Sequence, residues 1–229
     1  MQMHAGGAIL PRDHPARLSA MSDVRPTVFI VDDDVFVREA LESLIEVAGW
    51  EARAFESAQA FLSCPRPPGP SCLVLDLDLP DLSGLDLQRR VAQDRADMPI
   101  IFITGYGDVP TTVRAMKAGA VEFLTKPFGE DVLLDAIKDA LAHSRLAASR
   151  EAELRVLRNR HASLSRRERE VMGLVVSGLL NKQVGGELAI SEITVKAHRG
   201  RVMEKMKAGS FAELVKMSAR LGLQSAPDG

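Results

Sequence analysis

Residues 72–80 of this 229-residue chain read CLVLDLDLP, and this segment is the most informative one for the fold. Its first four residues are all apolar, which is typical of a parallel strand buried on both faces. The apolar run stops at Asp76, and Asp78 follows two residues later. Open α/β sheets place their sites just beyond the C-terminal ends of their strands. Asp76 is therefore the first candidate site residue.

Similar apolar runs on either side predict the rest of the sheet. Residues 27–31 and 100–103 are strong strand candidates, and residues 51–55 and 121–124 are weaker ones. Segments with helical spacing of apolar residues lie between them, the last starting near Glu130. Such an alternation predicts βαβ units. We expect an α/β fold, a doubly wound parallel sheet of five strands with five helices.

The other strand ends also carry polar side chains. They are Asp32-Asp33-Asp34, Thr104 and Lys126-Pro127. If the strands are neighbours, most of these side chains converge on Asp76. Asp34 is the exception, because a surface cap on the first helix explains it better.

This set of residues makes chemical sense together. Clustered carboxylates suit Mg²⁺, which keeps several waters and bridges to phosphate oxygens. A carboxylate can also act as the nucleophile in forming an aspartyl phosphate. Phosphoryl transfer depends mainly on positioning and charge neutralisation. The Lys126 ammonium would supply positive charge, and the Thr104 hydroxyl could donate a hydrogen bond to a phosphoryl oxygen.

Residues 26–140 resemble the receiver domain of two-component response regulators. The matching motifs are Val31-Asp32-Asp33-Asp34, Leu75 to Pro80, Asp81-Leu82-Ser83-Gly84, Ile103-Thr104-Gly105 and Thr125-Lys126-Pro127-Phe128. The resemblance implies that Asp76 accepts a phosphoryl group. It also implies that Asp32 and Asp33 organise Mg²⁺, Asp33 more directly, with the backbone carbonyl of Asp78 as a further ligand. Lys126 would contact the phosphoryl group through a Lys126–Pro127 peptide bond that is cis in the family.

Thr104 and Phe123 look like the switch pair of that family. There the hydroxyl moves toward the phosphoryl group and the aromatic ring turns inward. Plain core packing is the alternative role for Phe123. The acidic residue at Asp78 and the aromatic residue at Tyr106 depart from the commonest pattern, so the lifetime of the phosphoryl group stays open.

The regions flanking this domain have a different character. Residues 1–25 show no usable periodicity and predict a disordered tail, in which Met21 offers an alternative start. Residues 141–163 predict a helical linker, rich in Ala, Arg, Glu and Leu, which could also break around residues 143–149. No apolar run reaches the roughly 20 residues of a membrane span.

From Leu164 onward only helical patterns occur. Ser165 and Glu168 form a capping-box pattern before a helix over residues 166–177, which Gly178 ends. A short helix over residues 181–188 follows. Ser191 begins a third helix that runs to about Lys207 and that Gly209 stops, and Ser210 begins a last helix to about Leu221. Four short helices with a tight turn before the third predict a helix-turn-helix domain over residues 164–229.

Charge separates the two halves of the chain. Residues 1–150 carry 15 basic and 22 acidic side chains, whereas residues 151–229 carry 14 basic and 9 acidic ones. A basic C-terminal part indicates contact with a polyanion. The two cysteines, Cys64 and Cys72, form no disulfide framework, and we expect a cytoplasmic protein.

Residues 164–222 resemble the LuxR-type helix-turn-helix, and with the receiver in front they indicate the FixJ/NarL class. The matching stretches are residues 164–171, 178–183, 190–198 and 203–206. The run Gly105 to Pro110, with Ala115 to Ala120, looks closer to the FixJ branch. The resemblance implies a DNA-binding transcription regulator under a sensor histidine kinase. Activation is its usual outcome, with repression left open. The implied partners are double-stranded DNA, a second copy after phosphorylation, and RNA polymerase.

The recognition helix would be residues 192–207. By matching family positions, the base-facing candidates are Lys196, Ala197, Arg199 and Gly200, and the expected contacts to the DNA backbone are Lys182, Thr194, Arg201 and Lys205. Spacing indicates that Ile193, Val195, Val202 and Met206 face the core. Two features depart from the family: Gly185-Gly186 lies inside a helix, at about 1 kcal/mol per glycine relative to alanine, and Gly200 offers no base-reading side chain.

Three alternatives remain. Asp76-Leu77-Asp78 also resembles the nucleophile motif of haloacid-dehalogenase-type phosphatases, but Pro80 departs from that motif. A receiver that acts without phosphorylation is disfavoured by the complete set of Asp, Thr and Lys residues. A pure interaction module is disfavoured by the basic C-terminal part. We expect a regulator and not an enzyme.

Overall fold

The computed structural model describes residues 25–67, 69–95 and 97–223. The expected tail and its Met21 lie outside these residues, apart from Arg25. The chain divides into two compact units, residues 1–146 and 147–229. Each unit has its own core.

The first unit contains the predicted parallel sheet of five strands. The strands are β1 (Thr27–Val31), β2 (Glu51–Phe55), β3 (Ser71–Asp76), β4 (Ile100–Thr104) and β5 (Glu122–Thr125). Their order is β2-β1-β3-β4-β5, with every neighbouring pair parallel. The apolar runs thus predicted each strand to within a residue or so. β1, β3 and β4 are wholly buried, as their continuous apolar sequences require.

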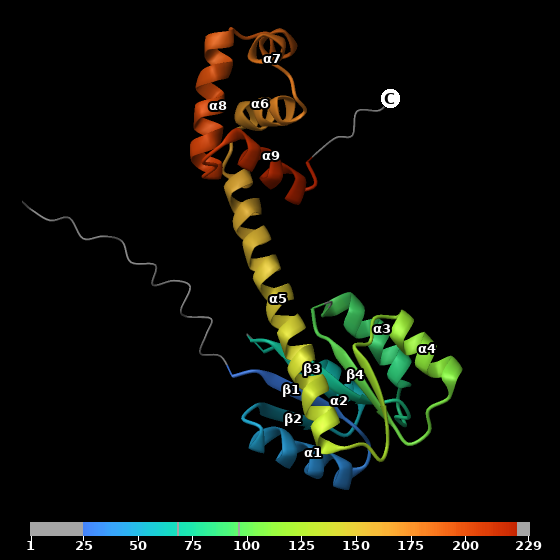
Figure 1. Ribbon diagram of the computed structural model, residues 1–229. Coiled ribbons are helices and arrows are strands. Elements are labelled where there is room, and N and C mark those ends of the chain that lie inside the picture. Colours follow the sequence, from blue (N-terminus) through green and yellow to red (C-terminus); the bar gives the residue numbers. More distant parts are fainter. Residues whose placement is uncertain (1–24, 68, 96, 224–229) are drawn as a thin grey trace, which may run out of the picture. The chain divides into compact units, whose positions relative to one another are not determined.

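Helices cover both faces of this sheet (Figure 1). They are α1 (Val35–Val47), α2 (Ala58–Ser63), α3 (Gly84–Asp94), α4 (Val109–Lys117) and α5 (Glu130–Ala162). Alternate strand residues pack toward α1 and α5 on one face, and toward α2, α3 and α4 on the other. The sheet is therefore doubly wound, as predicted.

α5 is one uninterrupted helix of 33 residues, so the break considered around residues 143–149 is absent. Ser144 is buried and its Oγ accepts a hydrogen bond from the Ser71 amide, which fixes this part of α5 to the sheet. The last turns of α5 belong to the second unit, where Leu157 is part of the core. Part of the expected linker is therefore integral to the C-terminal unit.

Four further helices complete the second unit. They are α6 (Arg166–Val176), α7 (Asn181–Leu188), α8 (Glu192–Met206) and α9 (Phe211–Arg220). Ser165 and Glu168 form the predicted capping box, and Ser191 and Ser210 cap α8 and α9. The end of α8 differs from expectation. Lys207, with φ of 56°, takes the left-handed position and Gly209 does not.

The structure explains why residue 185 is a glycine, which the sequence alone did not. A Cβ at this position would lie 2.8 Å from the carbonyl oxygen of Ile190, in the turn between α7 and α8. The Ile190 amide also donates a hydrogen bond to the Gly185 carbonyl. Glycine therefore permits the close approach of this turn to α7, which offsets its unfavourable helix propensity.

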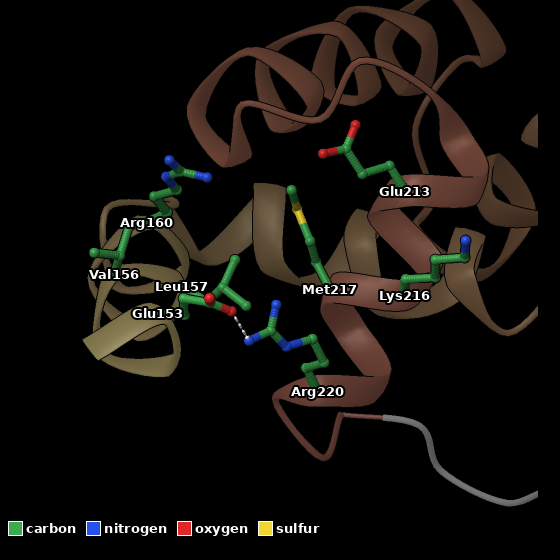
Figure 2. Close-up of a pocket in the computed structure, with 8 residues that line it drawn as sticks. All are labelled: Glu153, Val156, Leu157, Arg160, Glu213, Lys216, Met217 and Arg220. Atoms are coloured by element: carbon green, nitrogen blue, oxygen red, sulfur yellow. Dashed lines mark hydrogen bonds and ion pairs between the residues drawn. The ribbon is translucent and has the colours of Figure 1, made fainter. Parts of the chain in front are cut away.

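A shallow hollow of about 420 Å³ lies between the end of α5 and α9 (Figure 2). Across it, Arg220 pairs with Glu153 at 2.7 Å. Arg160, which also lines the hollow, donates a hydrogen bond to the Met206 carbonyl. Leu157 and Met217 form its apolar wall. These contacts fasten the last turns of α5 to the helical unit.

Candidate functional site

Three carboxylates meet at the C-terminal edge of the sheet. Asp32 and Asp33 follow β1, and Asp76 ends β3. β1 and β3 are parallel neighbours with Val31 opposite Leu75, so the residues that follow emerge together. Asp32, Asp33 and Asp76 each offer a carboxylate oxygen within 4.8 Å of the others. The structure thus brings together the acidic residues that the strand ends predicted.

Lys126 supplies a cation to this cluster. Its Nζ donates a hydrogen bond to Asp32 Oδ2 at 2.7 Å and lies 3.6 Å from Asp76 Oδ2. Its backbone amide donates to the Thr104 carbonyl, which holds the β5–α5 turn against the end of β4. The Lys126–Pro127 peptide bond is cis, as the resemblance implied.

The Asp76 carboxylate is buried, and among the described residues one of its oxygens lacks a hydrogen-bond partner. Its residue is 7% exposed, and Oδ1 is buried and accepts no hydrogen bond from any described residue. Burial raises the pKa of its carboxyl above the ordinary value; Lys126 opposes this rise and Asp32 adds to it. A buried oxygen without a partner is costly, and a bound cation would offset that cost.

The donor set fits a hard divalent cation. It consists of three carboxylates from two strand ends, two of them buried and one exposed. Asp78 lies two residues beyond Asp76 in the loop after β3, with an exposed side chain. Oxygen donors of this kind suit Mg²⁺, which takes one or two carboxylates and retains waters. The buried, unpartnered oxygen of Asp76 is consistent with such an ion.

Thr104 and Phe123 lie on adjacent strands beside the cluster. Thr104 is fully buried, and its hydroxyl accepts a hydrogen bond from the Tyr106 amide and donates one to the Tyr106 carbonyl. Phe123 is half-buried and packs against Phe102, with ring centroids 6.1 Å apart. The Thr104 hydroxyl is thus held by the β4–α4 loop and not by the carboxylates.

Several residues around the cluster were not singled out as supports from the sequence. Arg38 of α1 donates a hydrogen bond to the Asp32 carbonyl at 2.8 Å. Asp81 accepts hydrogen bonds from the Ala58 and Gln59 amides, which ties the β3–α3 loop to α2. A Cβ on Gly84 would lie 2.7 Å from the Asp76 carbonyl oxygen. Of these supporting residues, only Asp81 and Gly84 belong to a motif that the sequence analysis identified. The hydrogen bonds and close contacts themselves join distant segments of the chain, so no local pattern predicted them.

Asp34 behaves as expected for a helix cap. Its carboxylate accepts hydrogen bonds from the Phe36 and Val37 amides at the start of α1. Its backbone amide donates to Asp32 Oδ1 at 2.9 Å. Asp34 therefore shapes the turn that presents Asp32 and takes no part in the carboxylate cluster.

The predicted DNA-reading residues lie on α7 and α8 of the second unit. Most are exposed: Lys182, Thr194, Lys196, Ala197, Gly200 and Arg201. The Thr194 hydroxyl also forms a hydrogen bond with Ser191 Oγ, at 2.8 Å. These exposed positions are accessible to an external partner.

Arg199 and Lys205 have partners inside the domain. Arg199 Nη1 donates a hydrogen bond to Asn181 Oδ1 at 2.7 Å, and its guanidinium lies 5.2 Å from the Phe211 ring centroid. Lys205 pairs with Glu168 at 2.7 Å, and Glu168 is buried. This lysine, with the Ser165 amide, lowers the pKa of Glu168 to about 2. Arg199 links α8 to α7 and α9, and Lys205 links α8 to the start of α6.

One expectation about α8 is wrong. Val195, Val202 and Met206 are buried as predicted, but Ile193 is 82% exposed. Ile193 lies two residues before Val195 and nine before Val202, which is about half a turn around the helix from both, so it belongs to the opposite face of α8. Among the described residues, Ile193 is one of the most exposed large apolar side chains.

The fold and the acidic site define a receiver domain, and the C-terminal helices define a helix-turn-helix domain. Comparison with known families gives the same division. The response regulator receiver domain matches residues 28–138, and the luxR family of bacterial regulatory proteins matches residues 162–218. In the described part of the chain, no helix combines the length and apolar character needed to cross a membrane.

Individual relatives span nearly the whole chain. Nodulation protein W of Bradyrhizobium diazoefficiens is 48% identical over 204 residues, which cover 89% of this chain and 90% of that protein. The solved structure of the response regulator StyR has 46% identity and a TM-score of 0.75, covering 86% of this chain and 100% of that one. Full-length FixJ from B. japonicum has 40% identity and a TM-score of 0.52, covering 87% and 98%.

The chain belongs to the response regulators of the FixJ/NarL class, which join a receiver domain to a LuxR-type DNA-binding domain. Its relatives include several FixJ proteins, which agrees with the expected branch. Membership in this class makes the chain a DNA-binding transcription regulator of a two-component system, with a histidine kinase and DNA as its partners. The phosphatase-like reading of Asp76-Leu77-Asp78 gains no support from these matches.

Proposed function

We propose that a sensor histidine kinase phosphorylates this regulator on Asp76, and that the phosphoryl group controls DNA binding by α8. The observation that carries this proposal is the buried, unpartnered Asp76 Oδ1 beside two further carboxylates and Lys126. In the transfer, a carboxylate oxygen of Asp76 forms a bond to phosphorus. The phosphorus–nitrogen bond of a phosphohistidine breaks, and its electron pair stays on the imidazole.

Asp32, Asp33, Asp76 and the Asp78 carbonyl would hold Mg²⁺, with Asp33 as the exposed ligand. When bound, the ion supplies positive charge to the phosphoryl oxygens. Lys126 lies 3.6 Å from Asp76 Oδ2 and would contribute a second positive charge. Arg38 would support the Asp32 end of β1 through its hydrogen bond to the Asp32 carbonyl, and Gly84 leaves room for the Asp76 carbonyl at the end of β3.

The signal would leave the site through Thr104. Its hydroxyl is bonded to the Tyr106 backbone and would exchange these bonds for one to the phosphoryl group. Phe123 would then turn into the vacated space beside Thr104. The β4–α4 loop would lose its hold on the hydroxyl, which changes the surface around residues 109–135. This is a population shift driven by contacts to the phosphoryl group.

The result of phosphorylation would be binding of a dimer to two half-sites in double-stranded DNA. The proposed receiver is residues 26–140, the helical linker residues 141–163, whose last turns pack into the C-terminal unit, and the DNA-binding domain residues 164–229. Phosphorylation would favour a homodimer that reads two half-sites and engages RNA polymerase as an activator, in the cytoplasm. The proposed DNA contacts are Lys182, Thr194, Lys196, Ala197, Gly200 and Arg201, whereas the other two candidates, Arg199 and Lys205, are paired with Asn181 and Glu168.

Binding to a randomised DNA duplex pool tests this coupling. The full chain is incubated with Mg²⁺, with or without acetyl phosphate. The fraction of the duplex pool that it binds and its mass by sedimentation are then measured. For the wild type, we expect acetyl phosphate to increase both the fraction of DNA bound and the sedimentation mass. Asp76→Ala should not respond, whereas Asp34→Ser, which retains a helix cap, should respond normally. Equal responses of wild type and Asp76→Ala would contradict the proposal.

A further inference from the structure

The first turn of α8 carries an apolar side chain that the domain core does not use. Ile193 is 82% exposed, whereas Val195, two residues on, is fully buried. Its chain neighbours Glu192 and Thr194 are polar and exposed. One isolated side chain is far smaller than the roughly 800 Å² that each partner buries in a standard protein interface. Ile193 therefore suits a small apolar target better than a protein surface.

Ile193 shares one helix face with Ala197 and Gly200. These residues are spaced i, i+4 and i+7, which places them above one another along an α-helix. All three are exposed, and a Cβ on Gly200 would meet nothing within 4 Å. Ala197 and Gly200 are small, so this face can approach a ligand closely while Ile193 projects from its N-terminal end.

The face offers apolar contact more than guanine recognition. Arg199, a base-facing candidate from the sequence, is bonded to Asn181 and stacked on Phe211. Lys196 and Arg201 flank the face formed by Ile193, Ala197 and Gly200. In the major groove, thymine presents an apolar group, its C5-methyl, which is a target for apolar side chains. Helix-turn-helix proteins read bases mainly with the N-terminal residues of the recognition helix, where Ile193 lies.

We infer that Ile193 is a specificity-determining residue that selects thymine through contact with its C5-methyl group. The inference rests on the proposed function, in which α8 enters the major groove. In the free protein the Ile193 side chain gains nothing from burial. In the complex, each methyl-sized group removed from water is worth about 0.8 kcal/mol, or about fourfold in affinity. A dimer would show this preference once in each half-site.

The test uses the full chain, treated with acetyl phosphate and Mg²⁺, and a randomised DNA duplex pool. Wild type, Ile193→Ser and Ile193→Val are each used to select sequences. The selected duplex is then remade with deoxyuridine in place of each thymidine in turn, which removes only the methyl group. Thermal unfolding checks that the variants fold, as expected for an exposed position.

The inference predicts one thymine per half-site at which deoxyuridine weakens wild-type binding about fourfold. Ile193→Val should retain that preference. Ile193→Ser should lose it, and deoxyuridine at that position should then have no effect. The inference is overturned if Ile193→Ser selects the same thymine with the same deoxyuridine penalty, which leaves the proposed function intact. Failure of the wild type to select any sequence would overturn the proposed function and this inference together.

Discussion

The Lys126 ammonium lies 2.7 Å from Asp32, whose carboxylate is fully buried, and 3.6 Å from Asp76. Lys126 therefore neutralises Asp32 more closely than the proposed acceptor. A cation bound by the carboxylates would compete with Lys126 for these oxygens, whereas a phosphoryl group on Asp76 would attract it. In the proposed function, the same lysine would oppose binding of the metal and assist phosphoryl transfer.

Replacing Lys126 should separate these two effects. Lys126→Met retains the length of the side chain and removes its charge. We expect tighter Mg²⁺ binding, by about fivefold for the loss of one charge at this distance, and slower phosphorylation by acetyl phosphate. Calorimetry and time-resolved intact mass measure the two quantities. Lys117→Met, at an exposed position of α4, is the control. Unchanged affinity for Mg²⁺ in Lys126→Met would show that Lys126 does not compete with the ion.

Burial of Asp76 should make stability depend on pH. Because burial raises the pKa of this carboxyl, the folded protein binds its proton more tightly than the unfolded chain does. This contribution to stability is complete below the ordinary carboxyl pKa of about 4 and is lost as pH rises through the raised value. Without Mg²⁺, Asp76→Asn should therefore be more stable than wild type at neutral pH, with the difference shrinking toward pH 4.

Urea unfolding of the full chain between pH 4 and pH 8, in the presence of a chelator, measures this difference. Asp94→Asn, at an exposed position of α3, is the control and should show little change. If Asp76→Asn is less stable than wild type at neutral pH, the account of the Asp76 environment is wrong.

Gly84 should be intolerant of any side chain. A Cβ there would lie 2.7 Å from the Asp76 carbonyl oxygen and 3.0 Å from Phe102 Cε1. We expect Gly84→Ala to cost about 2 kcal/mol of unfolding free energy and to slow phosphorylation, because it displaces the end of β3. Gly105→Ala has open space around its Cβ and should be much milder. Equal effects of the two changes, by urea unfolding, would refute the packing argument.

The Glu168–Lys205 pair should stabilise the C-terminal unit. Lys205 lowers the pKa of Glu168 to about 2. The contribution is present above the ordinary glutamate pKa of about 4.3 and is lost as pH falls toward 2. We expect Lys205→Met to cost about 2 kcal/mol at neutral pH and less in acid. Lys207→Met, at an exposed neighbouring position, serves as the control.

The same variants test what Lys205 does on DNA. A lysine or arginine that contacts phosphate contributes about one unit to the slope of log affinity against log salt. Because Lys205 is paired with Glu168, Lys205→Met should leave that slope unchanged, whereas Arg201→Met should reduce it by about one. A reduced slope for Lys205→Met would restore Lys205 as a phosphate contact.

The sequence predicted the parts of the structure that depend on local pattern. Buried parallel strands are apolar throughout, so β1, β3 and β4 could be predicted from the sequence, and the polar residues beyond them followed from where each apolar run stopped. The partners of individual side chains could not be predicted. Lys205 and Glu168 are 37 residues apart, and no local pattern links them. Ile193 was wrongly grouped with Val195, because a separation of two residues places the two side chains on opposite faces of α8.

Intact-mass analysis after incubation with acetyl phosphate and Mg²⁺ measures directly whether Asp76 is phosphorylated. Wild type, Asp76→Ala and Asp78→Asn are compared as full chains, because Asp78 has an exposed side chain two residues from Asp76. We expect one added phosphoryl group on wild type and on Asp78→Asn, and none on Asp76→Ala. A phosphoryl group on Asp76→Ala would contradict this expectation and place the acceptor on another residue.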